Sequence, residues 1–220
     1  KRISATRASI APYPKSRVVT KLECGEDRER CQARHRWRVK DFMQGLCVYC
    51  ASSGAVEQAY FQAASALGVE MAHRQVPLIY GGGNVGLMGA IATAVHAHGG
   101  KVIGVIPHAL RERELAYLEA DELIITDGMR ERKAVMESRA LGFVALPGGM
   151  GTLEEVLEVL TSKNLHYHSK PIVFLNTLGF YNPLFALFDH MRENRFTPAN
   201  AAQSYDVANE PEDVFEFFGL

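Results

Sequence analysis

From Leu46 onward, short apolar runs alternate with stretches in which apolar residues recur every three or four positions. The runs are about strand length and rich in β-branched residues: "LCVYC", "VPLIYG", "KVIGVIP", "DELIIT", "GFVALPG" and "PIVFLN". Helical patterns lie between them, at about residues 56–73, 85–98, 129–141, 151–165 and 180–194. This repetition predicts parallel strands joined by right-handed crossovers. We therefore expect an α/β fold, a Rossmann-like doubly wound parallel sheet with helices on both faces.

Both ends of the chain add to this pattern. Residues 26–43 predict a further helix that leads into the first strand of the sheet. The tail "SYDVANEPEDVFEFFGL" predicts a last short strand and a helix that begins near Pro211. A chain of 220 residues suits one sheet domain. We expect that domain at residues 45–220, after a basic amino-terminal extension at residues 1–44.

Charge divides the chain unevenly. Residues 1–40 hold 12 Lys and Arg against 4 Asp and Glu, a net charge of +8, which leaves –9 on the rest of the chain. An acidic main domain argues against a nucleic-acid partner, and no apolar run is long enough to cross a membrane. The first 22 residues contain no acid and resemble organellar transit peptides in composition. We favour a basic arm that packs on a neighbouring subunit of a cytoplasmic protein, and keep an organellar location as the alternative.

Cys47 and Cys50 form a C-x-x-C pair within a predicted buried strand. Positions three apart on a strand point to opposite faces, so this spacing does not favour a redox pair. Cys24 and Cys31 lie in the extension, and no role is predicted for them.

Ligands of open α/β sheets bind beyond the carboxyl ends of the strands, so the loops after strands are the informative ones. The first is "YGGGNVGLMG", in which Gly81, Gly83 and Gly86 satisfy G-x-G-x-x-G. A dinucleotide site would also need an acidic residue at the end of the next strand, where this chain has Pro107 and His108. Two interpretations remain open: a mononucleotide approaches the bare loop, or the glycines serve a tight turn and close helix packing.

The second loop is "LPGGMGTLEEVLEVL", at the start of a predicted helix. Its glycines free backbone N–H groups to bind an anion, and the helix amino terminus adds positive potential. No lysine follows the glycines, so the loop is not a P-loop. Glu154 and Glu155 occupy the first helical turn, about 100° apart around the axis, so at most one points at the ligand. The dipole favours the ionised carboxylate, which suits a base or a group that stabilises positive charge; alternatively, both residues only complement the dipole.

The third loop opens the helical segment "TDGMRERKAVMESRA". Met129, Lys133 and Met136 predict one face of an amphipathic helix, with Arg130, Glu131 and Arg132 on the other. Cationic residues are unfavourable at a helix amino terminus, so a nearby anion would explain them. A charged face that contacts only solvent is the alternative.

Together these loops resemble the LOG (Lonely Guy) family of cytokinin riboside 5'-monophosphate phosphoribohydrolases. "LPGGMGTLEE" fits the pattern P-G-G-x-G-T-x-x-E, and "YGGGNVGLMG", "MRERKAVM" and "CVYCASSG" follow in family order and spacing from about Leu46 to Asn194. The resemblance implies hydrolysis of the N-glycosidic bond of a purine nucleoside 5'-monophosphate to free base and ribose 5-phosphate. N6-modified AMP is the implied substrate, with AMP possible as well. It implies a homodimer or larger homo-oligomer, no cofactor and no metal.

The family's functional residues fall on named positions of this sequence. The catalytic pair is Arg132 and Glu155. The implied substrate contacts are Glu114, Arg132, Lys133, Gly149, Met150, Gly151, Thr152, Leu153, Glu154, Glu155 and Thr161. Further candidates for a phosphate or nucleotide loop are Ser52, Ser53, Gly82, Gly83 and Gly148.

One departure from the family concerns the base pocket. Many relatives have "TWAQLG-H-KP" after the glycine motif, where this chain has "TSKNLHYHSKP", with Ser162, Asn164 and His166 in place of tryptophan, glutamine and glycine. His96 and His98 are two apart on a helix and do not share a face, which does not favour a metal site. The alternative function is a non-catalytic nucleotide or cofactor carrier of the same fold, although a carrier has little need for both Arg132 and Glu155. The lysine decarboxylase activity often assigned to such sequences would need pyridoxal phosphate on a lysine, and no lysine lies in a convincing pocket context.

Overall fold

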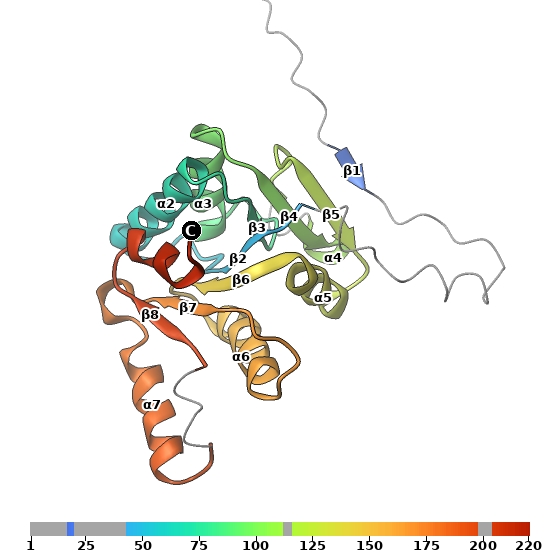
Figure 1. The fold of residues 1–220 in the computed structure, drawn as a ribbon. Coiled ribbons are helices and arrows are strands. Elements are labelled where there is room, and N and C mark those ends of the chain that lie inside the picture. Colours follow the sequence, from blue (N-terminus) through green and yellow to red (C-terminus); the bar gives the residue numbers. More distant parts are fainter. Residues whose placement is uncertain (1–16, 20–42, 112–115, 198–203) are drawn as a thin grey trace, which may run out of the picture.

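The computed structural model describes residues 17–19, 43–111, 116–197 and 204–220. In this part of the chain, strands and helices alternate around one central sheet (Figure 1). The strands are β1 (Arg17–Val19), β2 (Gly45–Tyr49), β3 (Leu78–Tyr80), β4 (Val102–Pro107), β5 (Glu122–Thr126), β6 (Ala140–Ala145), β7 (Ile172–Leu175) and β8 (Asp206–Ala208). The helices are α2 (Gln58–His73), α3 (Gly86–Ala97), α4 (His108–Arg111), α5 (Met129–Arg139), α6 (Met150–Asn164) and α7 (Asn182–Glu193), with 3₁₀ turns η2 (Thr177–Gly179) and η4 (Glu212–Phe218).

The sheet is parallel and doubly wound, which confirms the predicted fold class. Its strand order is β1-β5-β4-β3-β2-β6-β7-β8, and every neighbouring pair is parallel. From β2 the chain builds outward through β3, β4 and β5, then returns to place β6 on the other side of β2. The topological switch point therefore lies between β2 and β6, where the carboxyl ends of two central strands form a crevice for ligands.

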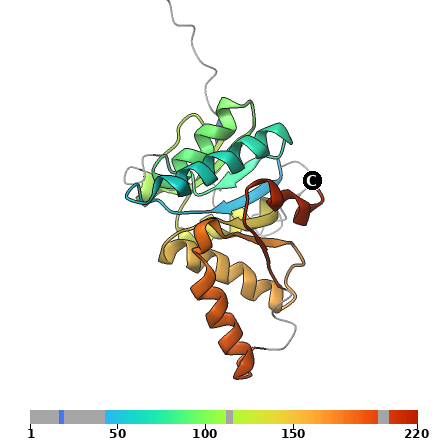
Figure 2. The same cartoon turned by 90° about the vertical axis from the view of Figure 1, so that its left-hand side faces the viewer.

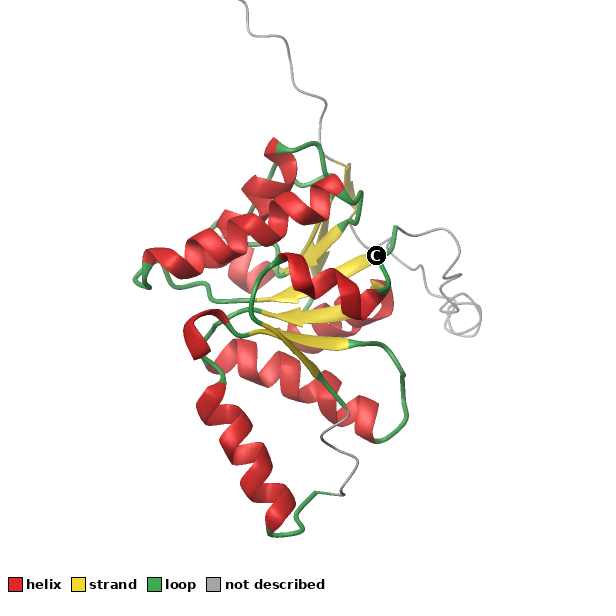
Figure 3. Cartoon of the chain, turned by 60° about the vertical axis from the view of Figure 1, so that its left-hand side comes forward, coloured by secondary structure: helices red, strands yellow, loops and turns green. Residues whose placement is uncertain are grey.

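Two hydrophobic cores lie on the two faces of the sheet. One core packs Leu67 and Met71 of α2 and Ile91 of α3 against the sheet, together with Phe215 of η4. The other places Met136 of α5 and Val156 of α6 on the opposite face, with the aromatic residues of α7 at its margin. Figures 2 and 3 show the helices on both sides of the sheet. This arrangement explains why the strands read as continuous apolar runs: every residue of β2, β3, β4 and β7 is buried.

The C-x-x-C pair shows the same division between the faces. Cys47 belongs to the core under α5 and α6, whereas Cys50 belongs to the core under α2 and α3. Both are buried free thiols, and burial raises the pKa of each. Their opposite directions agree with the strand geometry expected from the sequence.

The helices begin and end close to their predicted limits, and α7 differs from the others in its packing. It extends past the edge of the sheet (Figure 1) and has no buried residue. Within the described ranges, no helix is both long and apolar enough to traverse a lipid bilayer. Residues 26–42 of the helix predicted at 26–43 lie outside the described residues, and so do Cys24 and Cys31; Met43 is described and is not helical. β1 falls inside the predicted extension and pairs with β5 at the edge of the sheet, so part of that extension joins the fold.

Candidate active site

Three loops meet at the switch point. The N–H of Ala51, after β2, donates to the carbonyl of Pro147, after β6, at 3.3 Å. The carbonyl of Ala51 accepts from the N–H of Leu87, in the first turn of α3, at 2.9 Å. Gly86 makes this close approach possible, because a Cβ there would lie 2.5 Å from the carbonyl carbon of Ser52, and its φ is +56°. The loops after β2, β3 and β6 thus form one continuous surface at the carboxyl ends of these strands, and Ser52 and Ser53 are exposed on it.

Arg132 projects from α5 into this region and is held by the backbone of two strands. Its Nε donates to the carbonyl of Val105 on β4 at 3.1 Å, and Nη2 donates to the carbonyl of Gly81 at 3.0 Å. Its side chain is only 6% exposed. The sequence pattern grouped Arg132 with Arg130 on the helix face opposite Met136, and that grouping was wrong. Arg132 lies one turn before Met136, on the buried face, because the carbonyls beyond β3 and at β4 satisfy its donors.

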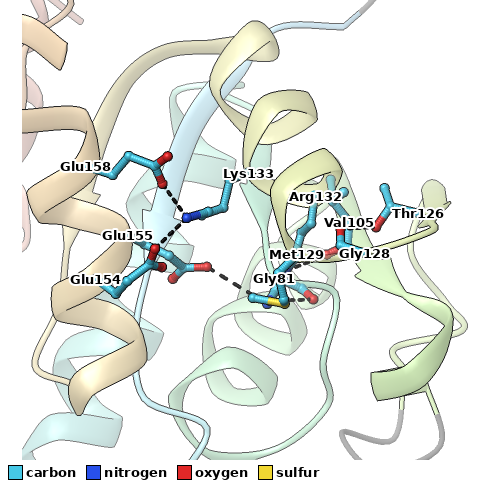
Figure 4. Close-up of polar contacts among 10 residues, drawn as sticks. All are labelled: Gly81, Val105, Thr126, Gly128, Met129, Arg132, Lys133, Glu154, Glu155 and Glu158. Atoms are coloured by element: carbon cyan, nitrogen blue, oxygen red, sulfur yellow. Dashed lines mark hydrogen bonds and ion pairs between the residues drawn. The ribbon is translucent and has the colours of Figure 1, made fainter.

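Glu155 faces Arg132 from the first turns of α6. Its Oε1 lies 3.9 Å from Nη1 of Arg132, and its side chain is 12% exposed. Figure 4 shows the two side chains pointing toward one another between α5 and α6. Since water is largely excluded, the attraction between the two charges is stronger than at the surface. The arrangement keeps the Glu155 carboxylate beside the fixed Arg132 guanidinium at the topological switch point of the sheet.

Lys133, the next residue on α5, pairs with a second set of carboxylates. It contacts Glu154 Oε1, and its Nζ lies 2.6 Å from Oε2 of Glu158 (Figure 4). These two glutamates are four apart and therefore share one face of α6. Hydrogen bonds to Glu154 and Glu158 raise the pKa of Lys133, so its amine stays protonated. Of the two adjacent glutamates in the motif, Glu155 thus meets the arginine and Glu154 meets the lysine.

The glycine turn before α6 is open to solvent. A Cβ at Gly149 or Gly151 would meet nothing within 4 Å, so neither glycine is required by contacts among the described residues. Met150 between them is 85% exposed. A Cβ at Gly148, by contrast, would lie 2.1 Å from Oγ1 of Thr152, whose side chain is buried against the turn. The first N–H groups of α6 therefore border open space, as an anion site at a helix terminus requires.

The first glycine loop is packed more tightly. Gly82 and Gly83 are buried; the carbonyl of Gly82 accepts from the N–H of Tyr117 at 2.9 Å, and Gly83 bridges Ala116. A Cβ at Gly82 would lie 3.1 Å from Cβ of Ile106, and its φ is +78°. Close backbone packing accounts for the glycine at position 82, and contact of Gly82 and Gly83 with a nucleotide stays a prediction.

Some predicted site residues are not brought to the Arg132–Glu155 pair. Thr161 lies six residues beyond Glu155, about 9 Å along the helix, and its hydroxyl donates to the carbonyl of Leu157 at 2.7 Å. Leu153 is half-buried at the edge of the core, and Glu114 lies outside the described residues. A hollow of about 420 Å³ on the face of α2 and α3, bordered by Phe61 and Thr93, is separate from the pair.

Two residues at the site were not singled out from the sequence. Glu158 could have been found from its spacing, since it follows Glu154 by one helical turn. Met129 precedes Arg132 by three residues, and its Sδ lies 3.6 Å from Nη1 of the arginine. Helical spacing makes that contact possible, but the sequence pattern had assigned Met129 and Arg132 to opposite faces of the helix.

Comparison with known proteins agrees with this geometry. Residues 88–218 match the family model described as "Possible lysine decarboxylase". LOG4 of Arabidopsis thaliana, a cytokinin riboside 5'-monophosphate phosphoribohydrolase, is 46% identical over 158 residues, which cover 72% of this chain and 74% of that protein. The chain belongs to the LOG family. The family protein named LOG from Oryza sativa subsp. japonica is 48% identical over 144 residues, covering 66% of this chain and 60% of that protein.

Solved structures agree at the level of the fold. The molybdenum cofactor carrier protein of Chlamydomonas reinhardtii superposes with a TM-score of 0.60 at 23% sequence identity, over 80% of this LOG-family chain and 94% of that one. At that identity the likeness concerns the architecture alone. The sequence relatives of this LOG-family chain, by contrast, carry phosphoribohydrolase names.

Proposed function

We propose that this chain hydrolyses the N-glycosidic bond of cytokinin riboside 5'-monophosphates, that is, of N6-modified AMP, and to some extent of AMP itself. The products are the free base and ribose 5-phosphate. The observation that carries the proposal is the Arg132–Glu155 pair, held at the switch point beside an open glycine turn. Family membership adds support, because relatives at 46% and 48% identity are named for this reaction.

The turn before α6 is the proposed binding site of the 5'-phosphate. Gly149, Met150 and Gly151 are exposed at the first turn of α6, with Thr152 buried beside them, and the helix dipole favours an anion at the N–H groups of this turn. Phosphate binding at this point is remote from the bond that breaks, so its binding energy positions the sugar for reaction. Ser52, Ser53 and Gly148 lie on the surface formed by the loops after β2, β3 and β6, and we propose them as additional contacts of the phosphate.

Glu155 is the proposed catalytic carboxylate. Cleavage of the ribosyl C–N bond builds positive charge on the sugar ring, and a nearby carboxylate stabilises that charge. Glu155 also orients a water whose oxygen bonds to C1' while the bond to the base nitrogen breaks, and the proton of the water ends on the base. Arg132 fixes the carboxylate through Nη1, since its other donors are engaged by Val105 and Gly81.

The test is base release from two substrates. Purified protein is incubated with isopentenyladenosine 5'-monophosphate or AMP, and free base is followed by chromatography. Glu155→Gln keeps the size of the side chain and should lower base release at least about 100-fold, by analogy with the loss of one transition-state electrostatic contact. Glu193→Gln, on the exposed last turn of α7, is the matched control and should retain activity. Absence of base release from both substrates, with tight nucleotide binding, would favour the carrier alternative instead.

A lysine decarboxylase would need a lysine amine that can form a Schiff base. Lys133 is the lysine placed at the site, and two carboxylates keep it protonated. A protonated amine does not attack a carbonyl, so this environment opposes that role. A visible absorption spectrum recorded after addition of pyridoxal phosphate, with no aldimine band, would agree with this conclusion.

We propose further that the active form is a homodimer or a larger homo-oligomer. The proposal follows from family membership. Sedimentation velocity at micromolar concentration is the test, and a single monomeric species would contradict it.

A further inference from the structure

The methionines of the described chain differ in exposure. Met43, Met129 and Met150 are 39%, 42% and 85% exposed, whereas Met71, Met88 and Met136 are buried; Met191, on α7, is half-buried. Exposed thioethers are open to oxidation by peroxide, and buried ones are protected. Two of the exposed methionines, Met129 and Met150, border the candidate active site.

Met129 differs from Met150 because it touches the catalytic guanidinium. Its Sδ accepts a weak hydrogen bond from Nη1 of Arg132 at 3.6 Å (Figure 4). That same nitrogen faces Oε1 of Glu155 at 3.9 Å. The contact therefore acts on the one side of the guanidinium that is directed at the carboxylate.

The remaining donors of Arg132 leave the group little freedom. Nε and Nη2 are bound to the carbonyls of Val105 and Gly81, which fixes the guanidinium plane. A change in the acceptor at Met129 can therefore not be relieved by rotation of the group. It changes how the protons of Nη1 are shared between Met129 and Glu155.

We propose that Met129 is an oxidation-sensitive positioning residue, whose conversion to the sulfoxide lowers the hydrolase activity and whose reduction restores it. The proposal rests on the proposed function, and it assigns a modification site to the same active site. Met129 acts through Arg132 and not on the substrate itself.

The chemical step is balanced with hydrogen peroxide as oxidant. A lone pair of the thioether sulfur attacks one peroxide oxygen, the O–O bond breaks, and the products are methionine sulfoxide and water. The sulfoxide oxygen is a polar acceptor where the sulfur was a weak one. It competes with Glu155 for Nη1, and it brings a polar group to the mouth of the site.

Other oxidisable side chains have to be separated from this effect. Cys47 and Cys50 are buried thiols whose pKa is raised by burial, so they hold little of the thiolate that peroxide attacks. Cys24 and Cys31 lie outside the described residues. The experiment therefore uses the full chain with both replaced by serine.

The test compares Met129→Leu with Met150→Leu, each measured relative to its own untreated activity. After graded peroxide treatment, oxidation of each methionine is quantified by peptide mass spectrometry and base release is assayed. The parent and Met150→Leu should lose about fivefold in kcat/KM as Met129 becomes oxidised, the size expected for the loss of one typical hydrogen bond. Met129→Leu should stay within about twofold. Treatment with both methionine sulfoxide reductases should restore the parent.

Two results would overturn the proposal: parallel inactivation of Met129→Leu and the parent, or full oxidation of Met129 with no loss of activity. A second readout does not require turnover. Bound AMP should slow oxidation of Met129 by about threefold or more, through loss of exposure, and leave Met43 unaffected. AMP that binds without protecting Met129 would also contradict the proposal. Base release by the untreated parent tests the proposed function separately, so failure of that function is distinguishable from failure of the Met129 inference.

Discussion

A Cβ atom on Gly81 would lie 2.0 Å from Nη2 of Arg132. The same nitrogen donates to the carbonyl of Gly81 at 3.0 Å, so the residue serves the arginine both by its carbonyl and by its missing side chain. The first glycine loop therefore helps to fix the position of Arg132, the proposed catalytic arginine. If the proposed function holds, Gly81 contributes to it without contacting the nucleotide.

Gly81→Ala should displace the guanidinium by an ångström or more and lower kcat about 100-fold, the usual cost of such a misplacement. Steady-state base release measures the effect. Gly142→Ala is the matched control, because its Cβ would lie 2.2 Å from Phe218 and away from Arg132. It should lower the melting temperature and leave kcat at 25 °C within about twofold. Equal losses of kcat in the two variants would show that the effect of Gly81 is only structural.

Lys133→Met should raise KM for the nucleotide about tenfold. The substitution leaves the negative charges of Glu154 and Glu158 uncompensated next to the proposed phosphate-binding site, where they repel the phosphate. Glu158→Gln removes one negative charge from the same place, so its KM should be unchanged or lower. Both shifts should shrink as salt is raised from 50 to 500 mM. Steady-state kinetics at the two salt concentrations checks this, and a rise of KM in both variants would contradict the electrostatic argument.

Tyr80 and Tyr181 are both buried, but they differ in the hydrogen bonding of their hydroxyl groups. The Tyr80 hydroxyl has no hydrogen-bond partner among the described residues, whereas the Tyr181 hydroxyl donates to the carbonyl of Leu146 at 2.6 Å. Tyr80→Phe should be neutral or stabilise the fold by up to about 1 kcal/mol, and Tyr181→Phe should cost about 1 to 1.5 kcal/mol. Urea unfolding of both variants is the measurement. A similar cost for the two would show that Tyr80 has a partner after all.

Asp121 joins α3, β4 and β5 at the amino edge of the sheet. It accepts from Lys101 at 2.7 Å, from the N–H of Val102 at 2.9 Å and bonds His96 at 2.9 Å. Burial opposes the ionised form, but these bonds outweigh it and lower the pKa of Asp121 below its usual 3.8. A depressed pKa contributes stability that is present above the unfolded pKa and is lost as pH falls through the folded one.

Asp121→Asn should therefore cost about 1 kcal/mol, with exposure of the group taken into account. The gap to the wild type should be full at pH 5 and smaller at pH 3. Urea unfolding at both values tests it, and a gap that widens at pH 3 would reverse the assigned sign.

Local patterns predicted the part of the site that is local. Glu155, Gly149 and Thr152 follow one strand and lie at the start of one helix, so spacing was enough to place them at that helix terminus, whereas the choice of Glu155 over Glu154 came from the family resemblance. The inward direction of Arg132 could not be predicted in this way. It depends on carbonyls 27 and 51 residues earlier in the chain, and no pattern within α5 records their presence.

The roles of the glycines show the same limit. The sequence left open whether the loop after β3 serves a ligand or close packing, because both need a bare backbone. The structure answers for Gly86 by the nearby carbonyl of Ser52 and for Gly81 by Arg132. In each case the deciding neighbour comes from another segment of the chain: the loop after β2 for Gly86 and helix α5 for Gly81. The fold class, by contrast, follows from short apolar strands alternating with helices, which is a property of consecutive residues.

The connection from β5 to β6 determines when the Arg132–Glu155 pair can form during folding. α5 lies on this connection, and Arg132 on it must reach the carbonyl of Gly81 just after β3, a carbonyl of β4, and Glu155 on α6. Contacts so distant in sequence form only after the long loops between them have closed, which is slow. The arginine and the glutamate therefore come together late, when both halves of the sheet are in place. Recovery of base release during refolding should therefore coincide with folding of the whole domain. A chain in which only half of the sheet has formed should be inactive.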